Sequence, residues 1–402
     1  MKKRIISLLL AVCMIFGMSA VAFAEEEPTL RFDENGEFTI LHLADCQDGY
    51  PADTRMLAYI DAVLKMYEPD IVILGGDNTV GEEETKREAI EELVSVFVEN
   101  ETYFTLVFGN HDYQQGVTDD EALVMYQEAG GEYCLAYDDV PELSGTATHN
   151  LPVYGSDSNE IKFNLWMFDS GDYEPMLDEN GNIVYDENGN MRDIGYQCVQ
   201  EDQIDWYIEK SNELKAETGD LVPSLAFQHI VVGDVYDALF AESAVDLGIL
   251  TPKYNGKIYS FLPKTDNFTG FLLEFPCPGV YNHGQFDAMV EQGDVAGIFS
   301  GHDHVNSYET ELDGIRIINT PGATYNSYAK DYLRGSRLIT VKEDDPANFT
   351  SEIITVNDMV LADDDFANEI GVSAFEAYIN IWFADIMLAL GKMTGIFAKI
   401  LL

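Results

Sequence analysis

The chain has 402 residues, of which 72 are acidic and 22 are basic, and its formal net charge at pH 7 is −50. A chain this acidic repels polyanions, so its general field excludes binding to nucleic acid or to anionic lipid. Anionic substrates are repelled as well, and a site for them requires a strong local positive charge such as bound metal ions.

Residues 1–24 predict a secretory signal peptide. Basic residues at positions 2–4 precede an apolar run over 5–21, and Ala22-Phe23-Ala24 supplies the small residues of a cleavage site. We therefore expect an exported protein, either secreted or associated with the cell surface or envelope. An uncleaved membrane anchor is the alternative, which the shortness of the apolar run disfavours.

The chain that follows alternates short apolar runs with helical patterns. Strands are predicted over 38–44, 70–74 and 103–108, and helices over 54–67 and 82–100. Further strands are predicted over 163–168, 224–228, 295–299, 315–318 and 338–341. Alternation of strands and helices predicts an α/β fold.

Four cysteines remain after the signal peptide, and they are widely spaced, without a C-x-x-C pair: Cys46, Cys134, Cys198 and Cys277. Four cysteines allow three disulfide pairings, among which a sequence cannot choose. Free, buried thiols are the interpretation that this spacing favours.

Polar side chains follow five of the predicted strands at the point where each strand ends. They are Asp45 and Gln47; Asp77; Asn110, His111 and Asp112; His229; and His302 and His304. Ligands of α/β sheets bind beyond the carboxyl ends of the strands, so we expect these side chains to lie together. Their oxygen and imidazole nitrogen atoms suit Mn, Fe or Zn. One such residue is commonly a helix cap or a core histidine, whereas the ordered set predicts a metal site.

The series D-x-Q, G-D-N, G-N-H-D, a later His and G-H-D-H resembles the motifs of the calcineurin-like metallophosphoesterases, from about Thr39 to Val341. The purple-acid-phosphatase-like branch of that superfamily is most similar, through residues 165–173, 300–306 and 325–337. The resemblance implies an α/β metallophosphatase fold over residues 25–360, in which a two-sheet β sandwich is flanked by helices.

The resemblance also implies a dinuclear site that holds two divalent or trivalent metal ions. Metal 1 would take Asp45, Gln47, Asp77 and His304, and metal 2 would take Asp77, Asn110, His229 and His302. The carboxylate of Asp77 would bridge the two ions. His111 would act as a general acid or stabilise charge on the phosphoryl group, and Asp112 would orient it.

Two departures from the family pattern concern the metal ligands. Gln47 stands where most members have a histidine, so we expect metal 1 to be held less tightly. Val80 stands where true purple acid phosphatases have the tyrosine ligand that gives their colour, so the protein is not expected to be purple.

The implied function is metal-dependent hydrolysis of phosphate esters, with phosphomonoesters favoured and a hydroxide between the metals as the nucleophile. A phosphodiesterase or nucleotide hydrolase is the alternative within the same class. A non-catalytic surface-binding protein that retains the fold is the alternative outside it. The presence of His111 and of nearly all the ligands argues against the last.

Three histidines and two arginines lie outside the predicted site. His42 is expected to be structural, His149 to sit in a polar loop, and His283 is a candidate to reach substrate. Arg334 and Arg337 either clamp phosphate or form ion pairs with nearby acids, and the acid-rich composition favours ion pairs.

Residues 361–402 predict a separate tail. The acidic stretch 361–366 is typical of a linker, and 375–402 predicts an apolar helix whose polar residues Asp385, Lys392 and Lys399 recur every seven positions. A helix this apolar must be covered by its own domain, by a partner helix or by a membrane interface, and these alternatives stay open.

Overall fold

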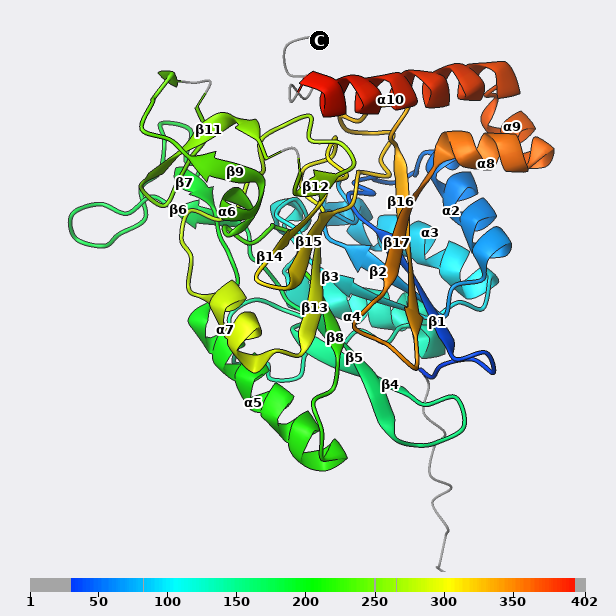
Figure 1. Ribbon diagram of the computed structural model, residues 1–402, viewed down its shortest axis with the longest axis horizontal. Coiled ribbons are helices and arrows are strands. Elements are labelled where there is room, and N and C mark those ends of the chain that lie inside the picture. Colours follow the sequence, from blue (N-terminus) through cyan, green and yellow to red (C-terminus); the bar gives the residue numbers. More distant parts are fainter. Residues whose placement is uncertain (1–29, 82, 249–250, 265, 395–402) are drawn as a thin grey trace, which may run out of the picture.

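The computed structural model describes residues 30–81, 83–248, 251–264 and 266–394, and its centre is a pair of β-sheets (Figure 1). The five-stranded sheet has the order β17 (Thr350–Thr355), β16 (Gly335–Lys342), β1 (Glu37–Leu43), β2 (Ile71–Gly75) and β3 (Phe104–Val107). The seven-stranded sheet has the order β12 (Phe268–Thr269), β14 (Glu309–Leu312), β15 (Ile315–Asn319), β13 (Val295–Ser300), β8 (Ser224–Phe227), β5 (Ile161–Met167) and β4 (His149–Tyr154).

The two sheets bury one face of each against the other. Phe38 and Ile40 of β1 share a buried cluster with Phe163 and Leu165 of β5, whereas Leu41 belongs to the cluster on the outer face. Alternate residues of a strand point to opposite faces, so each central strand contributes to both layers. Because both faces are covered, these strands are continuous apolar runs rather than alternating ones.

Helices cover the outer faces of both sheets. The five-stranded sheet packs against α2 (Thr54–Tyr67), α3 (Lys86–Glu99), α4 (Asp119–Gly130), α8 (Val356–Ala362) and α9 (Asp364–Ile370). The seven-stranded sheet packs against α5 (Glu201–Thr218), α6 (Val235–Leu239) and α7 (Gln285–Gln292). The predicted two-sheet α/β sandwich flanked by helices is therefore confirmed.

Smaller elements complete the described part of the chain. The hairpin strands are β6 (Tyr173–Pro175) and β7 (Asp193–Tyr196), and a three-stranded sheet holds β10 (Lys253–Tyr254), β11 (Lys257–Pro263) and β9 (Phe240–Glu242). Short 3₁₀ helices cover Glu83–Thr85, Asp112–Gln115 and Gly131–Tyr133. The helix predicted over 82–100 thus begins at Lys86, because a 3₁₀ turn precedes it.

The segment 361–366, predicted as a linker, is helical instead. Asp363 caps α9 by accepting hydrogen bonds from the backbone N–H groups of Asp365 and Phe366, and the Phe366 ring packs into the core. Acidic residues favour the first turn of a helix, so the charge that suggested a linker stabilises a helix start.

The predicted apolar C-terminal helix exists as α10 (Ala374–Thr394), and residues 395–402 of the prediction lie outside the described residues. Figure 1 shows α10 lying along the outside of the domain beside α8. Ala377 and Met387 are buried, while Phe375, Tyr378 and Trp382 are exposed. Its own domain therefore covers one face of the helix.

The predicted signal peptide also lies outside the described residues and stays a prediction.

Two further predictions concern single residues. His149 lies buried in β4 rather than in a polar loop, and its ring nitrogens contact Thr105 Oγ1 at 2.8 Å and the carbonyl of Ala147 at 2.7 Å. His42 is buried in β1 beside Thr320 Oγ1 at 2.7 Å, so its structural role is confirmed.

The four cysteines of the described chain are unpaired, and Cys46 is buried.

Candidate metal centre

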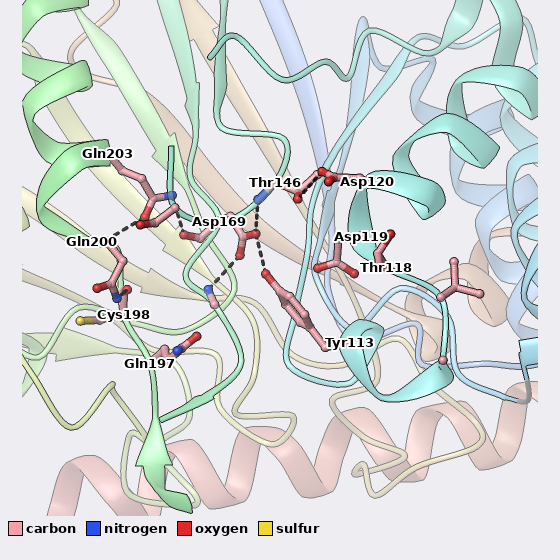
Figure 2. A pocket seen from close by; sticks show the side chains of 15 residues that line it. Tyr113, Thr118, Asp119, Asp120, Thr146, Asp169, Gln197, Cys198, Gln200 and Gln203 are labelled. Atoms are coloured by element: carbon pink, nitrogen blue, oxygen red, sulfur yellow. Dashed lines mark hydrogen bonds between the residues drawn. The ribbon is translucent and has the colours of Figure 1, made fainter. Parts of the chain in front are cut away.

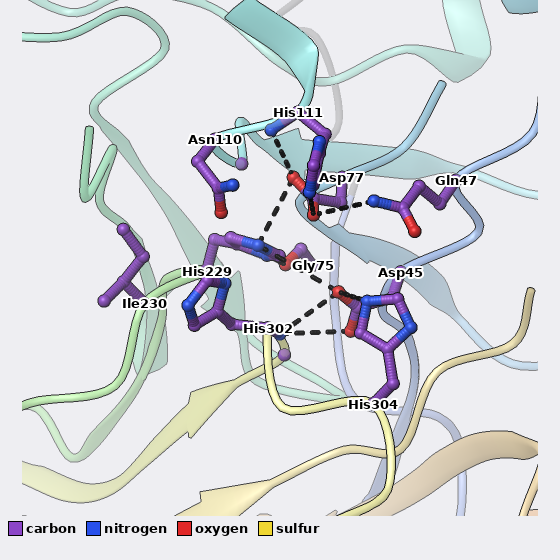
Figure 3. Close-up of polar contacts among 12 residues, drawn as sticks. Asp45, Gln47, Gly75, Asp77, Asn110, His111, His229, Ile230, His302 and His304 are labelled. Carbon is purple, nitrogen blue, oxygen red and sulfur yellow. Dashed lines mark hydrogen bonds and ion pairs between the residues drawn. The ribbon is translucent and has the colours of Figure 1, made fainter. Parts of the chain in front are cut away.

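The loops after β1, β2, β3, β8 and β13 meet at one edge of the sandwich (Figure 3). Strands β1, β2 and β3 are parallel, as are β8 and β13, so their carboxyl ends converge there. The structure brings together all the metal ligands predicted from the sequence and also His111: Asp45, Gln47, Asp77, Asn110, His229, His302 and His304.

Two buried carboxylates and three imidazoles form the middle of this centre. His229 Nε2 lies 3.4 Å from Asp77 Oδ1 and 4.0 Å from Asp45 Oδ1. On the other side, His304 Nε2 lies 3.3 Å from Asp45 Oδ1. The His302 ring lies edge-on to that of His229, with 5.1 Å between centroids. Asp45, Asp77 and His229 thus offer ligand atoms within 4.8 Å of one another.

The backbone around these ligands adopts conformations that side chains rarely allow. Positive φ angles occur at Asp45 (51°), Gln47 (43°), Asp77 (50°) and His302 (70°). Non-glycine residues avoid this region, and residues held there cluster at functional sites. Close packing adds to the constraint, because a Cβ atom on Gly76 would stand 2.5 Å from His229 Nδ1.

Backbone carbonyls orient two of the histidines. His229 Nδ1 donates to the carbonyl of Gly75 at 2.9 Å, and His304 Nδ1 donates to the carbonyl of Tyr328 at 2.9 Å. The His304 ring also stacks on Tyr328, with 4.2 Å between centroids. With Nδ1 engaged, each Nε2 is directed toward the carboxylates, as in histidines that bind metals.

Several ligand atoms of the centre make no hydrogen bond. Within the described chain, His229 Nε2, Gln47 Oε1 and Asn110 Oδ1 are buried without a hydrogen bond. An unpaired buried polar atom costs about 1–3 kcal/mol. The donor set of carboxylates, amide oxygens and imidazoles is one that Mn, Fe and Zn accept, so these residues fit a metal site.

The charges of the centre also fit bound cations. Burial, partly offset by His304 and His229, raises the pKa of Asp45 to about 6. Burial alone would lower the pKa of His229, but Asp77 and Asp45 outweigh it and raise that pKa to about 10. Burial would raise the pKa of Asp77, yet His229 and His111 hold it below its usual range. A proton on His229 thus balances the carboxylates in the metal-free protein, and a metal cation supplies the same balance.

Asp112 has a different role from the predicted one of orienting His111. Its carboxylate accepts hydrogen bonds from the backbone N–H groups of Asn78 (3.1 Å), Thr79 (3.2 Å) and Gly109 (3.0 Å). Lys86, which is fully buried, lies 3.5 Å away. Asp112 therefore joins the loops after β2 and β3, which carry Asp77 and Asn110, and acts on their backbone.

Two tyrosines that sequence reasoning left without a role contact the ligands. Tyr173 accepts a hydrogen bond from Asn110 Nδ2 at 3.1 Å, and Tyr328 holds His304 as described above. Both lie in stretches that carry the family resemblance, so a signal existed, but only the fold shows which atoms they meet.

The other candidates lie elsewhere. Arg337 pairs with Glu309 at 2.7 Å and Arg334 with Asp331 at 2.8 Å, which confirms the interpretation as structural ion pairs. His283 lies beside Glu201 at the start of α5, with Nδ1 3.7 Å from the carboxylate.

A sandwich of two sheets that gathers carboxylates, amides and imidazoles at its converging strand ends defines a class of metal-binding α/β proteins. The model of the calcineurin-like phosphoesterase family matches residues 38–306. The chain therefore belongs to the calcineurin-like phosphoesterase family, whose members hold a dinuclear metal site, and the resemblance expected from the motifs is confirmed.

Similar proteins come from plants and animals. The chain is 25% identical over 369 residues to "Probable inactive purple acid phosphatase 14" of Arabidopsis thaliana, with 82% of each chain covered. It is 25% identical over 359 residues to "Probable inactive purple acid phosphatase 29" of the same plant, with 81% of this chain and 82% of the relative covered. A solved dimetal phosphatase from Danio rerio shares 12% identity, with a TM-score of 0.46, and 79% of this chain and 98% of that chain are covered.

Proposed function

We propose that the protein hydrolyses phosphate esters, with phosphomonoesters as favoured substrates, at two metal ions held by the strand-end loops. The cluster of Asp45, Asp77 and His229 carries this proposal, because its buried ligand atoms lie within 4.8 Å of one another. His111 supports it further, since a histidine beside a metal centre is a ready proton donor.

The residues divide into two ligand sets that share Asp77. One set is Asp45, Gln47, Asp77 and His304, and the other is Asp77, Asn110, His229 and His302. When bound, two such cations neutralise phosphoryl oxygens and lower the pKa of a water molecule between them. Gln47 donates from Nε2 to Asp77 Oδ2 at 3.4 Å, and rotation of its amide brings Oε1 to the same place.

His111 is placed to serve the leaving group. Its side chain is 36% exposed, whereas the ligands around it are buried, and its Nε2 lies 4.0 Å from Asp77 Oδ2. Its backbone N–H donates to Asp77 Oδ1 at 2.7 Å, which fixes the loop to the metal centre. A protonated imidazole at the open side of the centre gives its proton to the departing oxygen, and the neutral ring is left behind.

A second candidate is a non-catalytic protein that uses the same fold to bind a partner. The curated relatives named as inactive favour it, and so does Gln47, which replaces the usual imidazole ligand. The retained ligand cluster and His111 favour catalysis.

Hydrolysis of paired model esters decides between these candidates. The full chain, loaded in turn with Mn, Fe or Zn, is assayed with 4-nitrophenyl phosphate and bis(4-nitrophenyl) phosphate, with Asp77→Asn as the background control. We expect faster turnover of the monoester than of the diester. Faster turnover of the diester would make the protein a phosphodiesterase, and metal binding without any turnover would favour the non-catalytic candidate.

We further propose that the protein is exported and that it contacts a membrane interface through the exposed face of α10. Residues Ala374–Gly391 are long and apolar enough to cross a membrane by length and composition only, and 17% of that segment is buried. The exposed face carries Phe375, Tyr378 and Trp382, and aromatic residues prefer the interface between water and lipid. The net charge of −50 favours zwitterionic over anionic lipid.

Flotation with phosphatidylcholine vesicles tests this contact. Wild type is expected to float with the vesicles, whereas Tyr378→Ser/Trp382→Ser is expected to stay in solution. Val124→Ser, a single exposed apolar residue on α4, serves as the control. Equal flotation of all three proteins, or of none, would contradict the proposal.

A further inference from the structure

A cavity of about 790 Å³ lies beside the metal centre, between the first turns of α4 and α5 (Figure 2). Part of its wall comes from the loop after β3, which also carries Asn110 and His111, and part comes from the loop after β5. Tyr113 lines it two residues after His111, and Gly171 lines it two residues before Tyr173, the partner of Asn110. Its volume is typical of sites for small organic molecules.

The charge of the lining excludes anions. The charged side chains that line it within the described chain are all acidic: Asp119, Asp120 and Asp169. Helix N-termini commonly bind anions, but both that border this cavity are closed by their own side chains. Thr118 Oγ1 accepts a hydrogen bond from the backbone N–H of Glu121 in α4, and Gln203 Oε1 accepts one from the backbone N–H of Gln200 at the start of α5.

The two buried carboxyls of the cavity differ in their partners. Asp169 accepts hydrogen bonds from Thr146 N (2.6 Å), the Tyr113 hydroxyl (2.7 Å) and Gly171 N (2.8 Å). Asp119 is 4% exposed, and among the described residues neither of its oxygens has a hydrogen-bond partner. The single proton of the Tyr113 hydroxyl is already given to Asp169, so Tyr113 does not donate a hydrogen bond to Asp119.

Leaving Asp119 unpaired is costly for the protein. Burial, together with the neighbouring Asp169 and Asp112, raises the pKa of Asp119 to about 9. Buried carboxyls without partners are rare in proteins, because each forfeits its hydration. At this pKa Asp119 is protonated in the empty cavity, and a cation bound there, helped by the first turn of α4, would stabilise the carboxylate while the proton passes to solvent.

Building on the phosphoesterase activity proposed above, we propose that this cavity receives the alcohol part of the substrate and that Asp119 selects alcohols bearing a cationic amine. The preferred substrates are then phosphomonoesters of amino alcohols. The two ends of such a molecule match the two sites, since the phosphoryl group meets metal ions and the ammonium group meets a carboxylate. Esters that carry further phosphate or carboxylate groups are repelled by the acidic walls.

Matched aryl esters test the selectivity. Initial rates give kcat/KM for 4-(aminomethyl)phenyl, 4-methylphenyl and 4-carboxyphenyl phosphate with wild type, Asp119→Asn and the control Asp205→Asn, which changes an exposed residue of α5. Wild type is expected to prefer the ammonium ester over the neutral one by about tenfold or more, as for a close charge pair. Asp119→Asn is expected to lose that ratio, and Asp205→Asn to keep it. A structural role of Asp119 would change both rates alike and leave the ratio intact.

Binding of a simple amine provides a readout independent of turnover. Calorimetry with benzylamine and benzyl alcohol is expected to show amine binding that Asp119→Asn weakens about tenfold or more. Equal binding to wild type and variant, or turnover of all three esters without an ammonium preference, would overturn the inference while the proposed function stands. If no ester is hydrolysed, the proposed function fails, and the assignment of the cavity to a substrate fails with it.

Discussion

Two clusters of buried charge lie next to each other behind the ends of β2 and β3, and they are completed in different ways. The carboxylate of Asp112 has three backbone N–H donors and the ammonium group of Lys86, so the chain itself satisfies it. Asp45 and Asp77 face each other across His229, and nearby ligand atoms have no hydrogen-bond partner within the described part of the chain.

This difference distinguishes buried charges that stabilise the fold from buried charges that serve a functional site. A structural cluster is balanced by its own residues, because an unpaired buried charge destabilises the fold. A functional cluster is left incomplete so that a ligand can complete it, and the folded chain bears the cost. The following variants test whether the two clusters respond as this distinction requires.

Loss of Asp77 is expected to have the largest effect on activity and a small one on the fold. Asp77→Asn should remove bound metal and reduce hydrolysis of 4-nitrophenyl phosphate by more than the roughly 10²–10³-fold that one electrostatic donor supplies. His302→Ala should act in the same direction. Elemental analysis, rates and thermal melting of the metal-free proteins provide the measurements. Full activity of the metal-free protein would contradict the proposed metal centre.

Loss of His111 should separate metal binding from proton transfer. His111→Ala is expected to keep both metals and to slow turnover about 10²–10⁴-fold, the usual range for a lost general acid. Metal content and kcat are measured on the same samples. If the variant loses metal, His111 is a ligand and the division of roles within the centre is wrong.

Loss of Lys86 should act on stability, because it belongs to the completed cluster. Lys86→Met leaves Asp112 buried without its cation, which typically costs about 3–5 kcal/mol. Lys65→Met is the control, since Lys65 is exposed and its pair with Asp61 is worth about 1 kcal/mol at most. Urea unfolding of both variants gives the two values. Similar losses would show that the buried pair has no special role.

Replacement of Gln47 is expected to have the smallest effect on activity and to test whether Gln47 is a ligand of metal 1. An amide oxygen is a weaker donor than imidazole for Mn, Fe or Zn, so Gln47→His should stay active and hold metal more tightly. A chelator titration of parent and variant compares the affinities. Easier loss of metal from the variant would mean that the ligand set of metal 1 must be redrawn.

Much of the fold and most of the centre could be predicted because the signals are local. Helix α2 occupies the predicted residues 54–67, since Asp53 caps its start and apolar residues recur on one face. The ends of the predicted strands differ from those of the observed strands by at most three residues, with the largest difference at the start of β16. Each predicted ligand lies within a few residues of the end of its strand. A correct prediction of where the strand ends therefore also predicts where the ligand lies in the fold.

What the sequence did not reveal depends on contacts between distant residues. Helix α5 is mostly polar, and only a narrow face with Ile204, Trp206 and Tyr207 is buried, so its apolar periodicity is weak. His149 is satisfied by Thr105, far away in the chain, and nothing local marks it as buried. Asp112 shows its role only once the loops after β2 and β3 are side by side.

Titration of the metal-depleted full chain with Mn, Fe or Zn is the decisive experiment for the proposed two-metal site. Bound metal and hydrolysis of 4-nitrophenyl phosphate are measured in the same samples, for wild type and for Asp77→Asn. We expect the activity of wild type to rise as two ions bind per chain, and we expect the variant neither to bind metal nor to gain activity. Hydrolysis by the metal-free protein, or two bound ions without turnover of any phosphate ester, would contradict this expectation.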